Sequence, residues 1–175
     1  MQTYQALEDL LWQACSDILS DIITDTTKIR WKHPTGGMPD WKVTDNILFL
    51  NLDEKDDAYA QQRDSIFNTV EGTVIRSAYR TRVWALYCTA YGPKSYDICN
   101  TLKDGFFEWK AEAPLWKNDV HLVPDLPRCQ QVPELFAGQW WTRWDLTLTF
   151  NELYRAQDDV GHIDSVQIFT STSQP

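Results

Sequence analysis

Long apolar runs are missing from this 175-residue chain: Ile47–Leu50 has four residues and Val83–Cys88 has six. A transmembrane helix needs roughly 20 apolar residues in succession, so the sequence predicts none. The N-terminal residues Met1–Tyr4 also lack the basic and apolar regions of a signal peptide, and we expect no secretory leader. We therefore expect no contact with a membrane.

Positive charge is also scarce. Lys and Arg number 16 against 25 Asp and Glu, which gives a net charge of −9. Free binding to nucleic acid or to an anionic membrane draws most of its affinity from basic residues, so this charge disfavours both functions. The remaining balance, 43% hydrophobic and 23% charged, is globular, and the length suits one domain. We expect a single domain over residues 1–170 and a loose tail over residues 171–175.

The motifs of metal, nucleophile and phosphate sites are absent too. No two cysteines form a C-x-x-C pair and no histidine lies at zinc-ligand spacing, so we expect reduced thiols acting as small hydrophobes, as in a cytoplasmic protein: Cys15, Cys88, Cys99 and Cys129. The sequence has no G-x-S-x-G and no Walker or dinucleotide-binding glycine pattern. We predict no catalytic residue, cofactor or metal.

One carboxylate pair is a candidate for acid–base catalysis. Asp104 and Glu108 lie four residues apart on a predicted helix and would share a face. Nothing in the sequence marks a cleft or a raised pKa beside them, so we interpret them as a solvated helix edge.

Hydrophobic periodicity predicts two helices. Apolar residues recur at steps of three and four from Thr3 to Ile23 and again from Pro93 to Lys110, where Gly105 predicts a bend or break. Alternation or apolar content predicts strands at Lys28–Lys32, Asn46–Leu52, Arg76–Tyr91, Val120–Val123, Trp140–Asn151 and Ile163–Thr170. Pro133–Phe136 is interpreted as a helical turn, the remainder of 111–133 as loop, and Tyr154–Gly161 as a polar connection.

Strands interrupted by one central helix indicate an α+β fold. We expect a mainly antiparallel sheet with the N-terminal helix and the central helix packed on it. At ~3.3 Å per residue, a strand over Arg76–Tyr91 is longer than a small sheet, so we expect part of it to project as an arm.

Tryptophan is unusually abundant, with nine residues in one small domain. Such residues can stack on carbohydrate, form a protein interface or belong to the core. Trp84 and Trp144 lie on apolar strand faces, which favours the core for these two. Trp140 and Trp141 are adjacent, so on a strand they point to opposite faces and cannot share one core. At least one of them should be exposed or held by a partner.

Four stretches together resemble a known family. They are Asp53–Asp64, Tyr87-Cys88-Thr89-Ala90-Tyr91-Gly92-Pro93, the run Pro133-Glu134-Leu135-Phe136 continuing to Asp145, and Phe150-Asn151-Glu152. In this order they are similar to the neck or tail-terminator (tail completion) proteins of tailed bacteriophages, over roughly residues 1–170. The most specific stretches are the Tyr-Gly-Pro turn and the Pro-Glu-Leu-Phe run.

The resemblance implies a structural role in the virion. Such proteins are α+β subunits of a ring, usually a hexamer, that caps the head-proximal end of the tail tube, stops its growth and joins the head connector while DNA passes through. It implies partners in other copies of the chain, the tail-tube protein, connector or neck proteins and the sheath protein of a sheathed tail, with no specific DNA binding. It implies assembly in the bacterial cytoplasm, and neither enzyme activity nor a cofactor.

Within that role we assign candidate residues. Tyr79, Arg80 and Arg82, near the start of the projecting strand, and the pair Trp140 and Trp141 are candidates for subunit or partner contacts. An acidic loop at Asp53–Asp57 lacks the spacing of a calcium loop, and a solvated loop is its default interpretation. Its carboxylates are candidates for a DNA-repelling ring lumen: Asp53, Glu54, Asp56 and Asp57.

Two other functions stay open at this point. A tryptophan-rich carbohydrate-binding module predicts an all-β sandwich with a flat tryptophan platform. A small hydrolase predicts a pocket with a perturbed carboxylate or thiol.

Overall fold

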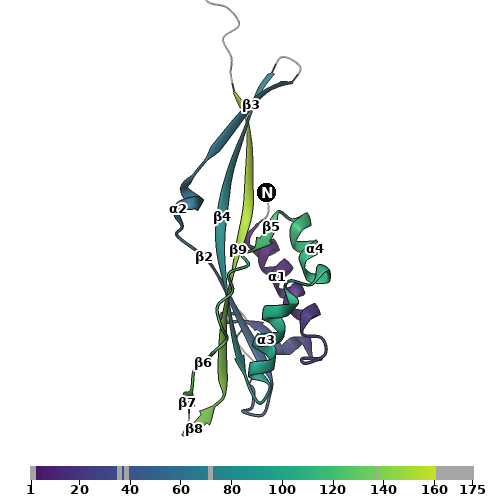
Figure 1. Cartoon of the computed structure of the whole chain (residues 1–175), viewed down its shortest axis with the longest axis vertical. Helices are drawn as coiled ribbons and strands as arrows, with labels where there is room; N and C mark the ends of the chain where they lie inside the picture. The colour runs from purple at the N-terminus through teal and green to yellow at the C-terminus, as the bar shows by residue number, and fades with distance from the viewer. Residues whose placement is uncertain (1–2, 35–36, 38–39, 71–72, 137, 161–175) are drawn as a thin grey trace, which may run out of the picture.

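The computed structural model describes residues 3–34, 37, 40–70, 73–136 and 138–160, which form an elongated molecule (Figure 1). In its lower part, here called the body, helices pack on one face of a sheet. In its upper part, here called the arm, strands continue beyond the helices. The arm consists of β3 (Asp64–Val70), residues 73–82 of β4 (Thr73–Tyr91) and residues 153–160 of β9 (Arg143–Val160).

The two long strands β4 and β9 run through both parts. They pair antiparallel from Val74–Val160 in the arm to Tyr91–Arg143 at the base of the body. On the other edge of β4, β2 (Ile47–Glu54) pairs with its lower half and β3 with its upper half. A chain segment containing the short helix α2 (Ala58–Gln61) links β2 to β3. The arm therefore shares its two central strands with the body.

The smaller strands complete the body. After a 3-10 turn, η1 (Thr26–Lys28), β1 (Ile29–Trp31) lies parallel to β2, and the other described pairings are antiparallel. β5 (Val120–Leu122) and β6 (Gln130–Gln131) pair with the outer edge of β9. β7 (Glu134–Phe136) and β8 (Gln139–Trp141) form a separate two-stranded ribbon.

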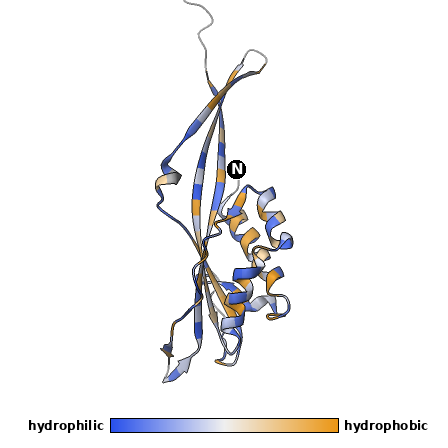
Figure 2. Ribbon diagram, in the orientation of Figure 1, coloured by the Kyte–Doolittle hydropathy of each residue, from blue (hydrophilic) through white to orange (hydrophobic). Residues whose placement is uncertain are grey.

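The core lies between the sheet and α1 (Tyr4–Ile18), α3 (Ser95–Gly105) and α4 (Trp109–Lys117). Because side chains alternate along a strand, every second residue of β4 and β9 faces the helices. The buried residues of these two faces are Trp84, Leu86, Cys88, Ala90, Leu146, Leu148 and Phe150. Along the arm, polar and apolar residues are mixed (Figure 2). The predicted α+β fold is confirmed.

The first predicted helix is confirmed, and local hydrogen bonds explain where it begins and ends. Thr3 caps α1, its hydroxyl accepting a hydrogen bond from the Ala6 N–H at 3.1 Å. The helix ends at Ile18, five residues before the predicted end, and a tighter turn follows in which Ile22 N–H bonds the Leu19 carbonyl. The buried Leu19 and Ile23 continued the apolar pattern beyond the helix itself.

The predicted break at Gly105 is confirmed. α3 ends there, and a Cβ at Gly105 would overlap the Cγ2 atom of Ile18 on α1. The absence of a side chain thus lets α3 approach α1. Two apolar residues of the predicted helix Pro93–Lys110, Tyr96 and Trp109, are largely exposed.

Four other sequence expectations are wrong. Residues 109–117, placed in a helix end and loop, form α4 with Pro114 inside it, because Ala111 and Leu115 are buried against the body. Pro133–Phe136 contains strand β7 rather than a helical turn. Tyr154–Val160, predicted as a polar connection, continues β9. The predicted strand Trp140–Asn151 is divided at Thr142 between β8 and β9.

The sequence did not predict strand β3. The predicted strand Ile163–Thr170 and the predicted tail 171–175 lie outside the described residues.

Candidate assembly surfaces

The helices α1, α3 and α4 do not extend over the arm, and α2 lies beside β4 (Figure 1). Several large apolar side chains of the arm face solvent. All seven residues of β3 are exposed. The large apolar ones on the arm are Ile66, Phe67, Val70 and Leu153. Among the described residues, the outer edge of β3 and the outer edge of β9 beyond Glu152 pair with no strand. Unpaired edges with apolar side chains are typical of surfaces that another chain covers.

A buried ion pair fixes the root of the arm. Glu152 on β9 is 3% exposed and accepts hydrogen bonds from Arg82 Nη2 at 2.6 Å and from Trp84 Nε1 at 2.7 Å. The Arg82 guanidinium also lies 5.0 Å from the ring centroid of Tyr154. The predicted contact residue Arg82 therefore makes its visible contacts inside the chain, where β4 and β9 leave the body.

Tyr79 and Arg80 line a shallow hollow on the arm. Ala78 on β4 and Ala156 on β9 are direct cross-strand partners, so two small side chains lie next to each other at this point of the sheet. The hollow of about 260 Å³ is lined by Arg63, Arg76, Ala78, Tyr79, Arg80, Tyr154 and Ala156. Its three arginines make this part of an acidic protein locally cationic, although Arg76 also pairs with Asp158 at 2.8 Å.

The acidic segment is only partly a loop. Asp53 and Glu54 end β2, paired with Ala85 and Trp84, which corrects the predicted loop boundary. Asp56 and Asp57 follow the strand, and Asp53, Glu54 and Asp56 are exposed. Gln61 donates a hydrogen bond to Asp56 at 3.4 Å. The four carboxylates thus occupy the end of β2 and the turn that leads to α2.

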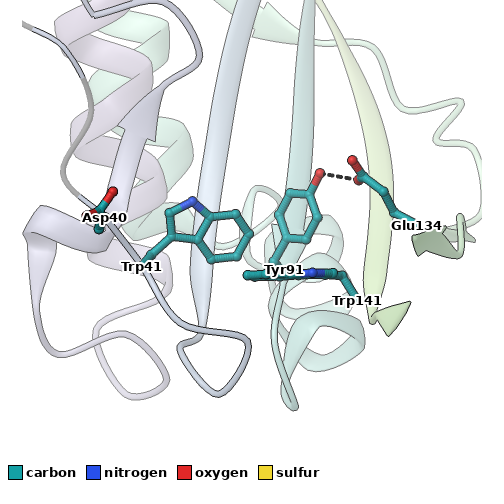
Figure 3. Close-up of a pocket in the computed structure, with 5 residues that line it drawn as sticks. All are labelled: Asp40, Trp41, Tyr91, Glu134 and Trp141. Atoms are coloured by element: carbon teal, nitrogen blue, oxygen red, sulfur yellow. Dashed lines mark hydrogen bonds between the residues drawn. The ribbon is translucent and has the colours of Figure 1, made fainter. Parts of the chain in front are cut away.

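Trp140 and Trp141 separate as the alternation predicted. On β8, Trp140 is 69% exposed, whereas Trp141 is part of an aromatic cluster. The Trp141 ring centroid lies 4.5 Å from that of Trp41 and 6.4 Å from that of Tyr91, and Trp41 lies 4.8 Å from Tyr91. A hollow of about 380 Å³ is lined by these three rings and by Asp40 and Glu134 (Figure 3).

A hydrogen bond joins the two most specific stretches of the sequence at this cluster. The Tyr91 hydroxyl, at the Tyr-Gly-Pro turn, donates to Glu134 Oε2 of the Pro-Glu-Leu-Phe run at 2.6 Å (Figure 3). Burial, with the bond to Glu134, raises the pKa of Tyr91 to about 12. Gly92 has φ +102°, and a Cβ there would overlap the Asp45 carbonyl oxygen. Spacing alone did not show that these stretches meet.

The charges around the cluster are divided between two hollows. Arg143 donates two hydrogen bonds to Asp145, at 2.9 and 2.7 Å, and one to Glu134 at 3.2 Å. The hydrogen bond to Asp145 is the main cause that raises the pKa of Arg143. A second hollow shares Trp41 and Tyr91 with the first but is lined by Lys32 and Arg143. One hollow is therefore acidic and the other basic.

The remaining candidates offer no site in the part of the chain that the structure describes. Asp104 is on α3 and Glu108 precedes α4, so they do not share a helix face, and both are exposed. Burial raises the pKa of Cys15 to about 12 and that of Cys88 above its usual value. No group of His, Cys, Asp and Glu in the described residues could hold a metal ion, and no described helix is long and apolar enough to cross a membrane.

Comparison with known proteins gives one result. The model of a family described as phage neck terminator protein matches residues 5–174, nearly the whole chain. No curated protein matches the sequence. The all-β sandwich that a carbohydrate-binding module would need is not the fold of the described residues, which pack helices on the sheet.

Proposed function

Because the chain belongs to the phage neck terminator family, we propose that it forms a ring, a hexamer, at the head-proximal end of the tail tube. Membership makes it a structural protein of the virion neck that meets other tail or head proteins. In the proposed ring it ends tube polymerisation, binds the head connector and lets genomic DNA pass through its centre. It assembles in the host cytoplasm and acts without catalysis.

The arm is the observation that carries this proposal. A ring of identical subunits needs a heterologous contact, in which one surface binds a different surface of the next copy. The arm supplies the first surface, since its apolar side chains and unpaired edges extend beyond the body. Its cationic hollow, with Tyr79 and Arg80, suits a neighbour that carries a net charge of −9. Arg82 acts through Glu152 by holding the arm in position.

The remaining candidate residues have separate roles in the proposal. Asp53, Glu54, Asp56 and Asp57 line the lumen, where like charge keeps phosphate from binding as DNA slides. Trp140, exposed at the base of the body, contacts another neck protein. The whole of 1–170 acts as one domain.

Light scattering and negative-stain imaging test ring formation. We expect a mass near six times 20.4 kDa and a particle with a central hole. Phe67 is 59% exposed on the arm, so Phe67→Glu should leave the fold intact and reduce the mass toward one chain. The control is Trp109→Glu, because Trp109 is equally prominent, 68% exposed, but on α4 of the body. A Phe67→Glu protein that still forms the same ring would contradict the role of the arm.

A further inference from the structure

We propose that the hollow between Trp41, Tyr91 and Trp141 binds the guanidinium group of an arginine presented by a partner protein. Ring formation is not needed for this hollow, because the described residues that line it all belong to one chain.

The first support is the arrangement of the rings. Trp41 and Trp141 are inclined by 68°, and Tyr91 and Trp141 by 88°, so the rings pack edge to face rather than in one stack, and all three line the hollow. The negative potential of an aromatic face attracts a cation within about 6 Å of the ring centroid, and tryptophan is the strongest of the three aromatic types. A cation in this hollow would face two tryptophans and a tyrosine.

The second support is the position of the carboxylates. In Figure 3, Asp40 lies beyond Trp41 at one end of the row of rings, and Glu134 lies beyond Tyr91 at the other. Glu134 accepts from Tyr91 and Arg143, but a carboxylate has about four acceptor sites, so one further donor can be accommodated. Among the described residues, no Lys or Arg lines this hollow.

The chain's own nearby cation is bound mainly to Asp145. The Arg143 guanidinium is 5.9 Å from the Tyr91 centroid, but Asp145 holds it bidentately, one further bond reaches Glu134, and it lines the basic hollow. We therefore expect a cation inside the acidic hollow to come from another molecule. Arginine fits better than lysine, since its planar group stacks on aromatic rings and presents several donors to carboxylates.

The test uses the full chain and a pair of small probes. The cationic probe is Nα-acetyl-arginine amide, and its neutral isostere is Nα-acetyl-citrulline amide, both titrated at constant ionic strength. The indole N–H signals of Trp41 and Trp141 are followed by NMR, with the signal of Trp84, buried in the body, as the internal control. We expect saturable shifts of the first two signals with arginine in the millimolar range, no shift of Trp84, and no saturation with citrulline.

Variants locate the site. Asp40→Asn combined with Glu134→Gln should weaken arginine binding about tenfold, since tenfold corresponds to about 1.4 kcal/mol and a charge-assisted contact is worth that much. Trp141→Leu should abolish the shift of Trp41, whereas Trp140→Leu, the adjacent exposed tryptophan outside the hollow, should not. Equal binding of citrulline, tighter binding of Nα-acetyl-leucine amide, no saturable shift, or loss of binding in Trp140→Leu would each overturn the proposal.

Discussion

Arg82 and Arg76 lie on the same strand and each faces a carboxylate directly across on β9, but they differ in burial. Arg82 and Glu152 are 13% and 3% exposed, whereas Arg76 and Asp158 are 44% and 55% exposed. Breaking a buried pair leaves a charge without compensation and costs about 3–5 kcal/mol, while an exposed pair is worth about 0–1 kcal/mol. This contrast offers a matched experiment on the root of the arm.

We expect Arg82→Met to lower the free energy of unfolding by about 3 kcal/mol and Arg76→Met by less than about 1 kcal/mol. Chemical denaturation at one protein concentration measures both, since assembly would otherwise change the apparent stability. Similar losses of unfolding free energy in the two variants would contradict a buried ion pair between Arg82 and Glu152.

Tyr91 gives a pH-dependent prediction. Its folded pKa is raised to about 12, above the unfolded value of 10.0, so the native state holds the phenol proton more tightly. The contribution to stability is complete below pH about 10 and is lost as the pH rises from about 10 to about 12. Tyrosinate absorbance should show a late ionisation step in the wild type that Tyr91→Phe lacks. Identical titration curves would refute the assignment.

At the residue scale, the sequence predicted the direction of a side chain but not the residues that it contacts. Alternation along a strand predicted that Trp140 and Trp141 point to opposite faces. In the structure Trp140 is exposed, and Trp141 packs against Trp41. The partners Trp41 and Glu134 come from loops and a short ribbon distant in sequence, so no local pattern joined them to Tyr91.

At the scale of elements, the contact of α3 with α1 depends on Gly105. Alanine is better than glycine within a helix by about 1 kcal/mol, yet a Cβ here overlaps Ile18. We expect Gly105→Ala to destabilise the protein by about 1–3 kcal/mol, as overpacking does. In an Ile18→Ala background the same change should cost less, and a double-mutant cycle by denaturation measures the coupling. Additive effects would mean that the two residues do not press on each other.

The long buried elements were predictable and the exposed ones were not. α1 carries an apolar stripe, and β2 and the lower half of β4 carry many apolar residues, because these elements are buried in the body. β3 is exposed throughout and has no such face. Its available signals in the sequence were the apolar pair Ile66-Phe67 and the glycine at position 72, a residue type that marks turns. Proline is unfavourable inside a helix, so Pro114 favoured a loop where the structure has α4.

At the scale of the whole molecule, the acidic lumen of the proposed ring has its own test. Replacing Asp53, Glu54, Asp56 and Asp57 by their amides removes four charges, from −9 to −5. We expect this variant to gain salt-sensitive affinity for duplex DNA, because the repulsion inside the proposed ring is reduced. Fluorescence anisotropy of labelled DNA at about 50 and about 200 mM salt measures it.

The matched control removes four exposed carboxylates from helices and the turn after α1: Asp9, Asp17, Asp21 and Asp104. It has the same net charge and should bind DNA no better than the wild type. If both variants gained equally, net charge rather than a lumen position would explain the effect.

The most direct test of the central claim is the length of tail tubes. The cognate tail-tube protein is polymerised with and without this chain, and tube lengths are measured by electron microscopy. The arm-mediated ring predicts that tubes stop growing with a cap at one end, that Trp109→Glu caps as the wild type does, and that Phe67→Glu does not cap. Tubes of equal length with and without the wild-type chain would contradict the account.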